Sequence, residues 1–551
     1  MANKAGPPDA FVYPVVNMGT RLREMREILA DLERKDLLNR IWHKDHTVWK
    51  PDPAEINNRL GWLQIMDDMA DKAGEIEAFA REIKEAGFHH VVLLGMGGSS
   101  LGAEVLRHTF GGAPGYPGLI VLDSTHPAQV EAVTRSIEVR HTLFLVSSKS
   151  GGTAETLALY NYFHDLAVRE TDAIQAGANF VAITDYGTPL YRLAEKANFR
   201  RIFKGPEDIG GRYSVLSYFG LVPAALEGID IQALLRSANR MQEACAPCVA
   251  VFENPGMWLG VLIGCLALHG CNKLTFIISP ALRSFGLWVE QLLAESTGKE
   301  GKGVIPVIDE PLVEPKYYGD DRLFVYLRMK GDQNSETDEG VVGLEVAGKP
   351  IIQLEINDQV DLGAEFFRWE FAVSIIGSVL GINPFDQPDV QSAKEATRAA
   401  LQDFQASGRF RRLPSCDSLE TWMEKSRPHD YLAIMAYLQQ TEAVDRALSE
   451  LRRKMVEKYQ VATTLGYGPR FLHSTGQLHK GGPDSGLFLQ ITAQRRKDLS
   501  LPGEPYSFGI LTEAEALGDY QALEARGKRI ARIQLSSASG AAVKRLAQDL
   551  D

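Results

Sequence analysis

The sequence predicts an α/β fold built on mainly parallel sheets. From residue 89 onward, short apolar runs of strand length alternate with segments of helical periodicity. These runs are apolar throughout rather than alternating with polar residues, which is typical of strands covered by helices on both faces. Strands and helices in regular alternation indicate doubly wound αβα sandwiches.

The first 85 residues predict a helical N-terminal arm. Residues 18–32 place leucine, methionine and isoleucine on one face of a helix, and residues 56–86 carry apolar positions three or four apart. We assign residues 1–85 to this arm.

The next stretch contains four strand-turn-helix units closed by a fifth strand, which we assign to a first α/β domain at residues 86–230. Proline begins two of its predicted helices, at Pro127 and Pro189, a favoured first helical position. The predicted strands are residues 91–94, 119–122, 143–146, 180–183 and 201–204.

The remaining residues, 231–551, predict a second α/β domain that begins with two connecting helices. Residues 404–430 are polar and contain glycine and proline, so we expect an insertion or long loop there. Strands are predicted at 274–278, 323–327, 351–356, 431–436, 461–465 and 487–491, and helices at 231–246, 255–269, 285–294, 364–380, 512–526 and 541–550.

The overall charge and the apolar runs exclude several classes. The 551 residues include 59 lysines and arginines against 71 aspartates and glutamates, a net charge of −12 that disfavours nucleic-acid binding. The N-terminus lacks the apolar segment of a signal peptide. The longest apolar run, residues 257–268, is too short to span a bilayer. We expect a cytoplasmic protein without a membrane partner.

The cysteine pattern does not predict a metal or redox cofactor. Five cysteines form no disulfide framework in a chain of this length. Cys245 and Cys248 make a CxxC pair, but it follows a helical pattern, whereas a redox pair stands after a strand at a helix start. No second CxxC or histidine pair has zinc-site spacing.

A loop rich in hydroxyl groups follows the third predicted strand. Residues 148–156 read SKSGGTAET and lead into a helix. The first amides of a helix have no internal partner and favour an anion. Neither a GxxxxGK[ST] nor a GxGxxG pattern is present, so a phosphomonoester fits better than a nucleotide. The alternative is an ordinary βα loop in which serine or threonine caps the helix.

Four further segments concentrate functional side chains at turns. Residues 210–214 set Arg212 beside two glycines, and residues 291–299 place Glu295 near the end of an apolar helix. Gln387 and Lys394 stand seven residues apart, which is two turns along one helix face. The loop at residues 472–482 contains two histidines.

Together these segments resemble the glucose-6-phosphate isomerase (phosphoglucose isomerase) family. The shared motifs are GxGGSxLG at residues 95–102, SKSGGTAET at 148–156, GGRYS at 210–214, QxxxESxGK at 291–299 and FDQPxVxxxK at 385–394. The resemblance runs from about residue 85 to the C-terminus and implies sugar-isomerase (SIS) type α/β domains. It is similar in detail to the isomerase module fused behind a transaldolase in some bacteria. No transaldolase-sized barrel precedes it, so we expect a stand-alone isomerase.

The resemblance implies roles for individual residues. Glu295 would move a proton between C1 and C2 of the sugar, Arg212 would stabilise a cis-enediolate, and Lys394 and His473 would assist ring opening. The substrate would be a sugar phosphate and no cofactor would be needed. The substrate-binding residues it implies are Gly98, Ser99, Ser148, Lys149, Ser150, Thr153, Thr156, Gly211, Gln291 and Gln387.

The histidine assignment departs from the family's order of motifs. The family's histidine segment lies between the ESxGK and FDQ motifs, whereas here it follows both. His473 fits the spacing to the following glutamine, and His479 is the alternative. In the family this histidine reaches into the neighbouring subunit's site, which implies a homodimer.

Two other functions compete with isomerisation of glucose 6-phosphate. The isomerase half of a glucosamine-6-phosphate synthase would accompany an amidotransferase with an N-terminal cysteine, and this chain begins Met1-Ala-Asn. A non-catalytic sugar-phosphate sensor would need the hydroxyl loop but has no reason to keep Glu295, Arg212 and Lys394 together.

Overall fold

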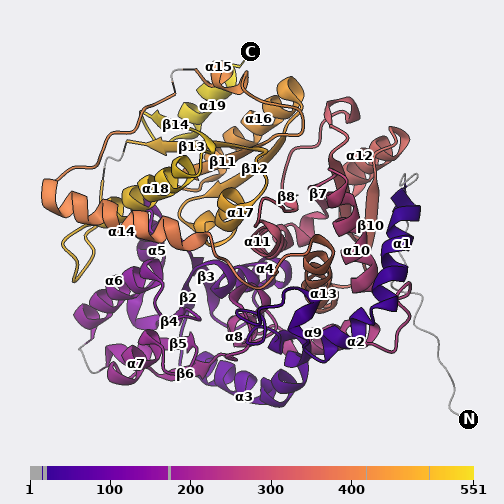
Figure 1. The fold of residues 1–551 in the computed structure, drawn as a ribbon. Coiled ribbons are helices and arrows are strands. Elements are labelled where there is room, and N and C mark those ends of the chain that lie inside the picture. The colour runs from indigo at the N-terminus through magenta and orange to yellow at the C-terminus, as the bar shows by residue number, and fades with distance from the viewer. Residues whose placement is uncertain (1–14, 17–20, 172–174, 417, 495–496, 551) are drawn as a thin grey trace, which may run out of the picture.

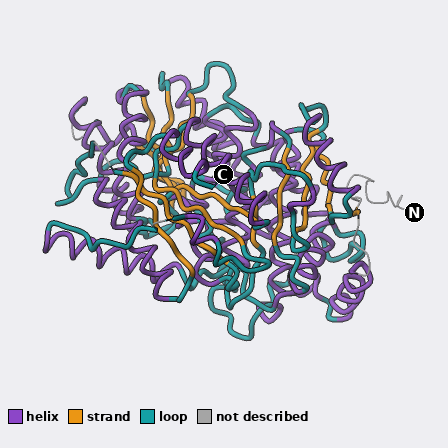
Figure 2. Tube along the Cα trace, turned by 90° about the horizontal axis from the view of Figure 1, so that it is seen from above, coloured by secondary structure: helices purple, strands orange, loops and turns teal. Residues whose placement is uncertain are grey.

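The computed structural model describes residues 15–16, 21–171, 175–416, 418–494 and 497–550 (Figure 1). Their strands form three sheets, in which parallel pairing dominates, and helices cover the sheets. Figure 2 shows the strands through the middle of the molecule and helices around them. The predicted α/β class with mainly parallel sheets is confirmed.

The first sheet is fully parallel and has the strand order β3-β2-β4-β5-β6. Its central strands are buried along almost their whole length, which explains their unbroken apolar sequences. The strands are β2 (His90–Gly95), β3 (Gly118–Leu122), β4 (Thr142–Ser147), β5 (Phe180–Thr184) and β6 (Arg201–Lys204).

The helices that follow these strands include the two that the sequence predicts to begin at proline. Proline opens α5 and α7, because its missing N–H is not needed in the first turn. The helices are α4 (Leu101–Phe110), α5 (Pro127–Ser136), α6 (Ala154–Glu170), α7 (Pro189–Lys196) and α8 (Tyr218–Leu226).

The second sheet has the order β1-β10-β9-β7-β8, in which only β1 is antiparallel to its neighbour. Its strands are β1 (Val15–Val16), β7 (Lys273–Ile278), β8 (Ile305–Val307), β9 (Arg322–Met329) and β10 (Ile351–Ile356). Its helices are α9 (Ile231–Ala244), α10 (Pro255–Leu268), α11 (Phe285–Thr297), α12 (Ser335–Val346) and α13 (Leu362–Leu380). Nearly every residue of α13 is buried, since it packs against α9, α10 and α11.

A third, fully parallel sheet has the order β12-β11-β13-β14. Its strands are β11 (Tyr431–Tyr437), β12 (Ala462–Tyr467), β13 (Gly486–Ala493) and β14 (Arg529–Leu535). The accompanying helices are α14 (Val390–Ser407), α15 (Leu419–Met423), α16 (Glu442–Tyr459), α17 (Gly476–Gly481), α18 (Phe508–Ala525) and α19 (Gly540–Gln548).

The number of sheets corrects the predicted architecture. We expected two doubly wound units, but residues 231–551 contain two separate sheets instead of one. The strands of residues 273–356 pair among themselves and with β1, and those of residues 431–535 pair only among themselves. The third sheet has an apolar core cluster of its own, whereas the second sheet shares the large cluster with the first sheet. The domain boundaries at residues 85 and 230 stay predictions.

Two local predictions also change. The N-terminal arm is helical in α1 (Arg21–Arg34), α2 (Leu37–Trp42) and α3 (Ile65–Glu85), but residues 56–64 form turns and a short 3₁₀ segment rather than the start of α3. In the segment predicted as a loop at residues 404–430, α14 continues to Ser407 and α15 forms a short helix.

Helix α11 lies where the three sheets meet. It packs against α4 from the first sheet, α13 and β8 from the second, and α17 from the third (Figure 1). Groups near its C-terminal end are therefore within reach of loops from all three. Among the helices of the described ranges, none combines the length and the apolar character that crossing a bilayer requires.

Candidate active site

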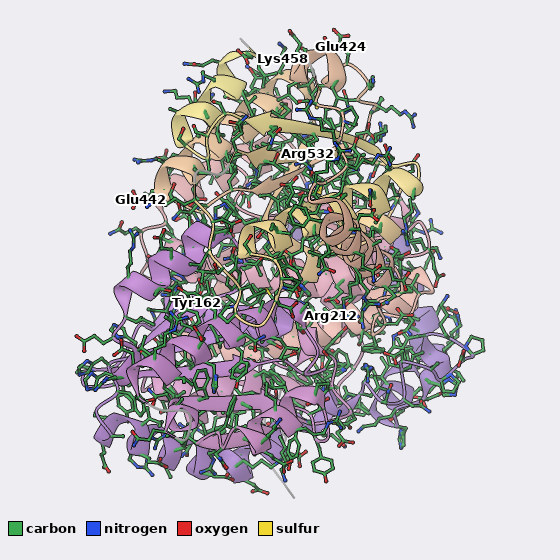
Figure 3. The ribbon with its side chains drawn as sticks, turned by 90° about the vertical axis from the view of Figure 1, so that its left-hand side faces the viewer. Tyr162, Arg212, Glu424, Glu442, Lys458 and Arg532 are labelled. Atoms are coloured by element: carbon green, nitrogen blue, oxygen red, sulfur yellow. The ribbon has the colours of Figure 1, made fainter. Side chains whose placement is uncertain are left out.

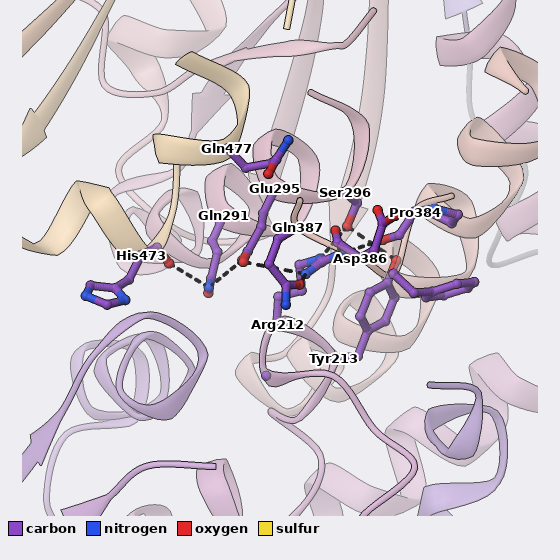
Figure 4. Close-up of polar contacts among 12 residues, drawn as sticks. Arg212, Tyr213, Gln291, Glu295, Ser296, Pro384, Asp386, Gln387, His473 and Gln477 are labelled. Carbon is purple, nitrogen blue, oxygen red and sulfur yellow. Dashed lines mark hydrogen bonds and ion pairs between the residues drawn. The ribbon is translucent and has the colours of Figure 1, made fainter. Parts of the chain in front are cut away.

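A carboxylate and a guanidinium stand together at the end of α11. Glu295 Oε1 lies 3.6 Å from an Nη of Arg212, and the two side chains are 15% and 2% exposed. Figure 3 shows Arg212 between the N-terminal and C-terminal parts of the chain, and Figure 4 shows its contacts. A pair this close and this shielded from water interacts strongly.

Arg212 is held rigidly by its surroundings. Its Nε donates to Ser296 Oγ at 2.7 Å, and one Nη donates to Gln387 Oε1 at 3.0 Å. The other Nη donates to the carbonyls of Pro384 and Asp386 at 2.7 and 3.0 Å. These bonds fix the plane of the guanidinium, so its charge is pre-positioned beside Glu295.

Gln291 connects the carboxylate to the histidine loop. One turn before Glu295 on α11, its Nε2 donates to Glu295 Oε2 at 3.0 Å and to the carbonyl of His473 at 2.8 Å (Figure 4). The row His473, Gln291, Glu295, Arg212 therefore joins three separate segments of the chain into one site.

His473 pairs with an acid that sequence reasoning missed. His473, at the end of η11 (Arg470–His473), lies 2.7 Å through Nε2 from Glu155 Oε1. Burial raises the pKa of the Glu155 carboxyl, but the contact with His473 and the nearby charge of Lys394 outweigh it, so the pKa lies below its ordinary value. Glu155 stands inside the SKSGGTAET motif, which was the only available signal.

The structure separates the two candidate histidines. His479 is 3% exposed and packs between the rings of Phe471 and Phe488, with centroid distances of 5.8 and 5.1 Å. Burial lowers the pKa of His479 well below its ordinary value. His479 is therefore a core residue, and His473 is the histidine at the site.

The contact between His473 and Glu155 lies within one chain. The expected homodimer, in which His473 would enter the site of a neighbouring subunit, stays a prediction. The loop after β12 carries His473 onto the first turn of α6 of the same molecule, because the third sheet packs beside the first.

The hydroxyl loop forms as predicted at the start of α6. Ser148 is buried, and its Oγ lies 3.0 Å from Thr153 Oγ1. Thr153 occupies the N-cap position, but its side chain makes no capping hydrogen bond. This disfavours the alternative of an ordinary capped loop and leaves amides of the first turn open to an anion. Ser150 is exposed and accepts a bond from the Gly152 amide at 3.4 Å.

Two predicted members of this loop point elsewhere. The Nζ of Lys149 donates to both carboxylate oxygens of Asp185, at 2.8 and 2.6 Å, and to the Pro206 carbonyl. Burial lowers the pKa of Lys149, against the effect of Asp185. Lys149 thus joins the loops that follow β4, β5 and β6. Thr156 is fully buried, one turn into α6.

The glycine loops at residues 97–99 and 210–212 touch each other. A Cβ on Gly98 would lie 2.1 Å from the carbonyl oxygen of Gly211, so only glycine permits this approach. Gly97 has φ +55°, and a Cβ there would lie 2.5 Å from the carbonyl of His473. This packing sets Ser99, which is 8% exposed, at the meeting point of the site segments.

The FDQ segment reaches the site from the far side of Arg212. Gln387 is exposed, yet its Oε1 accepts the bond from Arg212. Lys394 is exposed on α14, and its charge acts on Glu155. Lys299, which the sequence reading did not assign to the site, is buried and donates to the carbonyl and to Oδ1 of Asp386, both at 2.6 Å. Burial and the neighbouring Arg212 lower the pKa of Lys299 to about 8.

Behind α11 lies a cavity of about 780 Å³ into which the opposite face of the helix presents Glu290. Glu290 is 8% exposed and has no hydrogen bond to any described residue. Burial raises the pKa of Glu290 to about 8, despite the charge of Arg452. Between the ordinary pKa of a glutamate and about pH 8, Glu290 is therefore protonated in the folded protein and ionised in the unfolded chain.

Glu290→Gln is expected to raise the melting temperature, and more at about pH 9 than at about pH 6. The favourable contribution of a group with a raised folded pKa is present at low pH and is lost as pH rises through about 8. Glutamine does not titrate. Thermal unfolding at both pH values, with the exposed Glu424→Gln as control, measures this difference. A gain that is the same at both values would contradict the assignment.

The fold and the site define a class: an α/β protein of phosphosugar-isomerase type, with a carboxylate, a fixed guanidinium and an anion loop beside one helix. The family model for phosphoglucose isomerase matches residues 63–306. A probable glucose-6-phosphate isomerase of Natronomonas pharaonis is 31% identical over 349 residues, which are 56% of this chain and 78% of the relative. The chain belongs to the glucose-6-phosphate isomerase family.

Two further comparisons agree with this membership. A probable glucose-6-phosphate isomerase of Methanococcus maripaludis is 29% identical over 385 residues, covering 63% of this chain and 85% of the relative. A solved glucose-6-phosphate isomerase from Chlamydia trachomatis superposes with a TM-score of 0.60 at 18% identity, over 70% of this chain and 87% of that one. That likeness is one of fold.

Proposed function

We propose that this chain catalyses the reversible aldose-ketose isomerisation of glucose 6-phosphate and fructose 6-phosphate. The observation that carries the proposal is the pairing of Glu295 with a buried Arg212, which donates four hydrogen bonds to its surroundings, in a member of this family. Moving a carbon-bound proton requires a positioned carboxylate, and the developing oxyanion requires a fixed positive charge.

In this proposal Glu295 transfers the proton between C1 and C2, and Arg212 stabilises the cis-enediolate. Gln291 orients Glu295 through the bond to Oε2 and, with Gln387, contacts sugar hydroxyls. No step needs a metal or a redox cofactor, because the proton leaves and returns through the same carboxylate.

His473 and Lys394 assist opening of the sugar ring by proton transfer at the ring oxygen and the C1 hydroxyl. Glu155 is a positioning residue, since its carboxylate contacts Nε2 of His473 and so fixes the orientation of the imidazole. The charge of Lys394 acts on the same carboxylate, which supports a common location for the two ring-opening groups.

The hydroxyls of Ser99, Ser148, Ser150 and Thr153, with the first amides of α6, hold the phosphate group. The phosphate does not react, so its binding energy serves to position the sugar at Glu295. Gly98 and Gly211 shape the adjoining loops. Lys149 and Thr156 support the loop from behind rather than contact the phosphate, given the bonds of Lys149 to Asp185.

Ser148→Ala and Thr153→Ala are each expected to raise KM for fructose 6-phosphate about tenfold, with kcat little changed. A hydrogen bond to a charged group contributes about 1.5–3 kcal/mol, and a bond made equally in ground and transition states affects KM alone. Steady-state kinetics test this, with Ser136→Ala at the end of α5 as control. An unchanged KM for both variants would place the phosphate elsewhere.

One coupled assay tests the proposed function itself. Fructose 6-phosphate is supplied, and glucose 6-phosphate is detected with a dehydrogenase. Turnover supports the isomerase, whereas binding of sugar phosphate without turnover would favour the sensor alternative.

A further inference from the structure

The loop that delivers His473 is fastened to the first sheet by a buried ion pair. Arg470, three residues before His473, contacts Asp123 at the end of β3 through two nitrogens, each at 2.8 Å. Asp123 is 3% exposed. Removing one partner of such a buried pair strongly destabilises a protein, because the other charge stays buried without a partner. The pair therefore holds η11 against the first sheet.

A second group of buried bonds joins α18 to the same part of the first sheet. Thr125 Oγ1 donates to Glu515 Oε2 at 3.0 Å, and Thr512 Oγ1 donates to the Thr125 carbonyl at 3.2 Å. Thr125 and Thr512 have no exposed surface, and Glu515 is 3% exposed. These buried bonds join the third sheet to the first through α18.

A third connection runs from α17 to the helices that carry the other site residues. Gln477 is completely buried. Its Nε2 donates to the carbonyl of Gly298 at the end of α11 and to Asp389 Oδ2, at 3.0 and 2.7 Å. Its Oε1 accepts from the Asp389 amide at 2.9 Å, just before α14 and Lys394. One amide thus holds three segments of the site together.

We infer that residues 431–550 take the place that a partner subunit would otherwise fill, and that one chain contains the complete site. The inference rests on the proposed function and deepens it, because it names the catalytic unit as the monomer. Glu295, Arg212, Glu155 and His473 are already joined by intrachain contacts. An intramolecular docking of this kind does not depend on protein concentration.

Co-expression of two inactive variants distinguishes this arrangement from a shared site. Glu295→Gln and His473→Ala, carrying different affinity tags, are produced in the same cells so that any oligomer can form during folding. His473 is 18% exposed at its side chain, so its truncation leaves the core intact. Both tags in sequence isolate mixed oligomers, and the total lysate measures activity.

If each site lies within one chain, every site carries one of the two substitutions, whichever chains associate. The activity of the lysate then equals the sum of the activities of the two variants expressed alone. If the site is shared across a twofold interface, half of the dimers are mixed and each has one intact site. Activity would then recover to about a quarter of the wild-type value. Recovery of that size overturns the inference.

A dilution series of the wild-type enzyme gives a second measurement. Specific activity is expected to stay constant from micromolar to sub-nanomolar protein, and a fall that follows the loss of dimer by light scattering would contradict the inference. Wild-type activity is the reference in both experiments. An inactive wild type would therefore refute the proposed function. The single-chain site would be refuted by activity recovered on co-expression of the two variants, or by wild-type activity that falls with dilution.

Discussion

Glu295→Gln is expected to lower kcat by about 10² or more while KM for fructose 6-phosphate changes little. Glutamine has nearly the same shape and can keep the bond to Gln291 Nε2, but it cannot take a proton from carbon. The ion contact with Arg212 at 3.6 Å is lost, which alters the charge of the site without opening a cavity.

The measurement is steady-state kinetics in both directions, with proton exchange between C2 of glucose 6-phosphate and solvent followed by NMR. Glu300→Gln is the matched control, because Glu300 lies five residues further along the chain and pairs with Lys50 at the surface. The control should retain wild-type turnover. A Glu295→Gln variant with unchanged kcat would show that another group moves the proton.

The local elements of the fold could be predicted because they depend on short sequence patterns. The central strands of the first sheet are buried on both faces, and their continuous apolar sequences predict this burial. Helix α16 was missed because charged residues dominate its sequence, although one face is buried. Strand β14 was also missed, because it contains Arg529 and Arg532. These arginines form ion pairs with Asp430 and Glu513, which lie outside the strand.

The division into three sheets depends on which strands pair, and pairing joins segments far apart in the chain. Residues 273–356 and 431–535 have the same kind of strand and helix pattern, so composition cannot separate them. The three-residue strand β8 is too short to stand out from its loop. Tertiary packing therefore decides the architecture of the C-terminal half.

Residues of the candidate site could be predicted where they belong to a recognisable motif. They could not be predicted where only a contact between distant segments shows their part in the site. Glu295 and Arg212 come together as their motifs implied. Glu155 becomes recognisable only through His473, which lies 318 residues later. Lys149 lies in the phosphate motif, but its Nζ donates to the Asp185 carboxylate and to the Pro206 carbonyl. Both partners lie on other loops, so the motif alone does not show this role.

Arg212→Lys is expected to lower kcat and kcat/KM together by about 10²–10³, as for loss of an oxyanion-stabilising donor. Lysine keeps a positive charge, but an ammonium cannot bond at once to Ser296 Oγ, Gln387 Oε1 and the Pro384 carbonyl as the planar guanidinium does. The charge would no longer be fixed beside Glu295 when the enediolate forms.

The same substitution should lower the melting temperature, because each buried acceptor left without a donor costs about 1–3 kcal/mol. Kinetics measured well below the melting temperature separate the catalytic loss from unfolding. Arg283→Lys is the matched control, since Arg283 is 69% exposed and pairs with Asp309. If Arg212→Lys loses stability but keeps kcat, the guanidinium serves only to hold the loops, and the enediolate must be stabilised by another group.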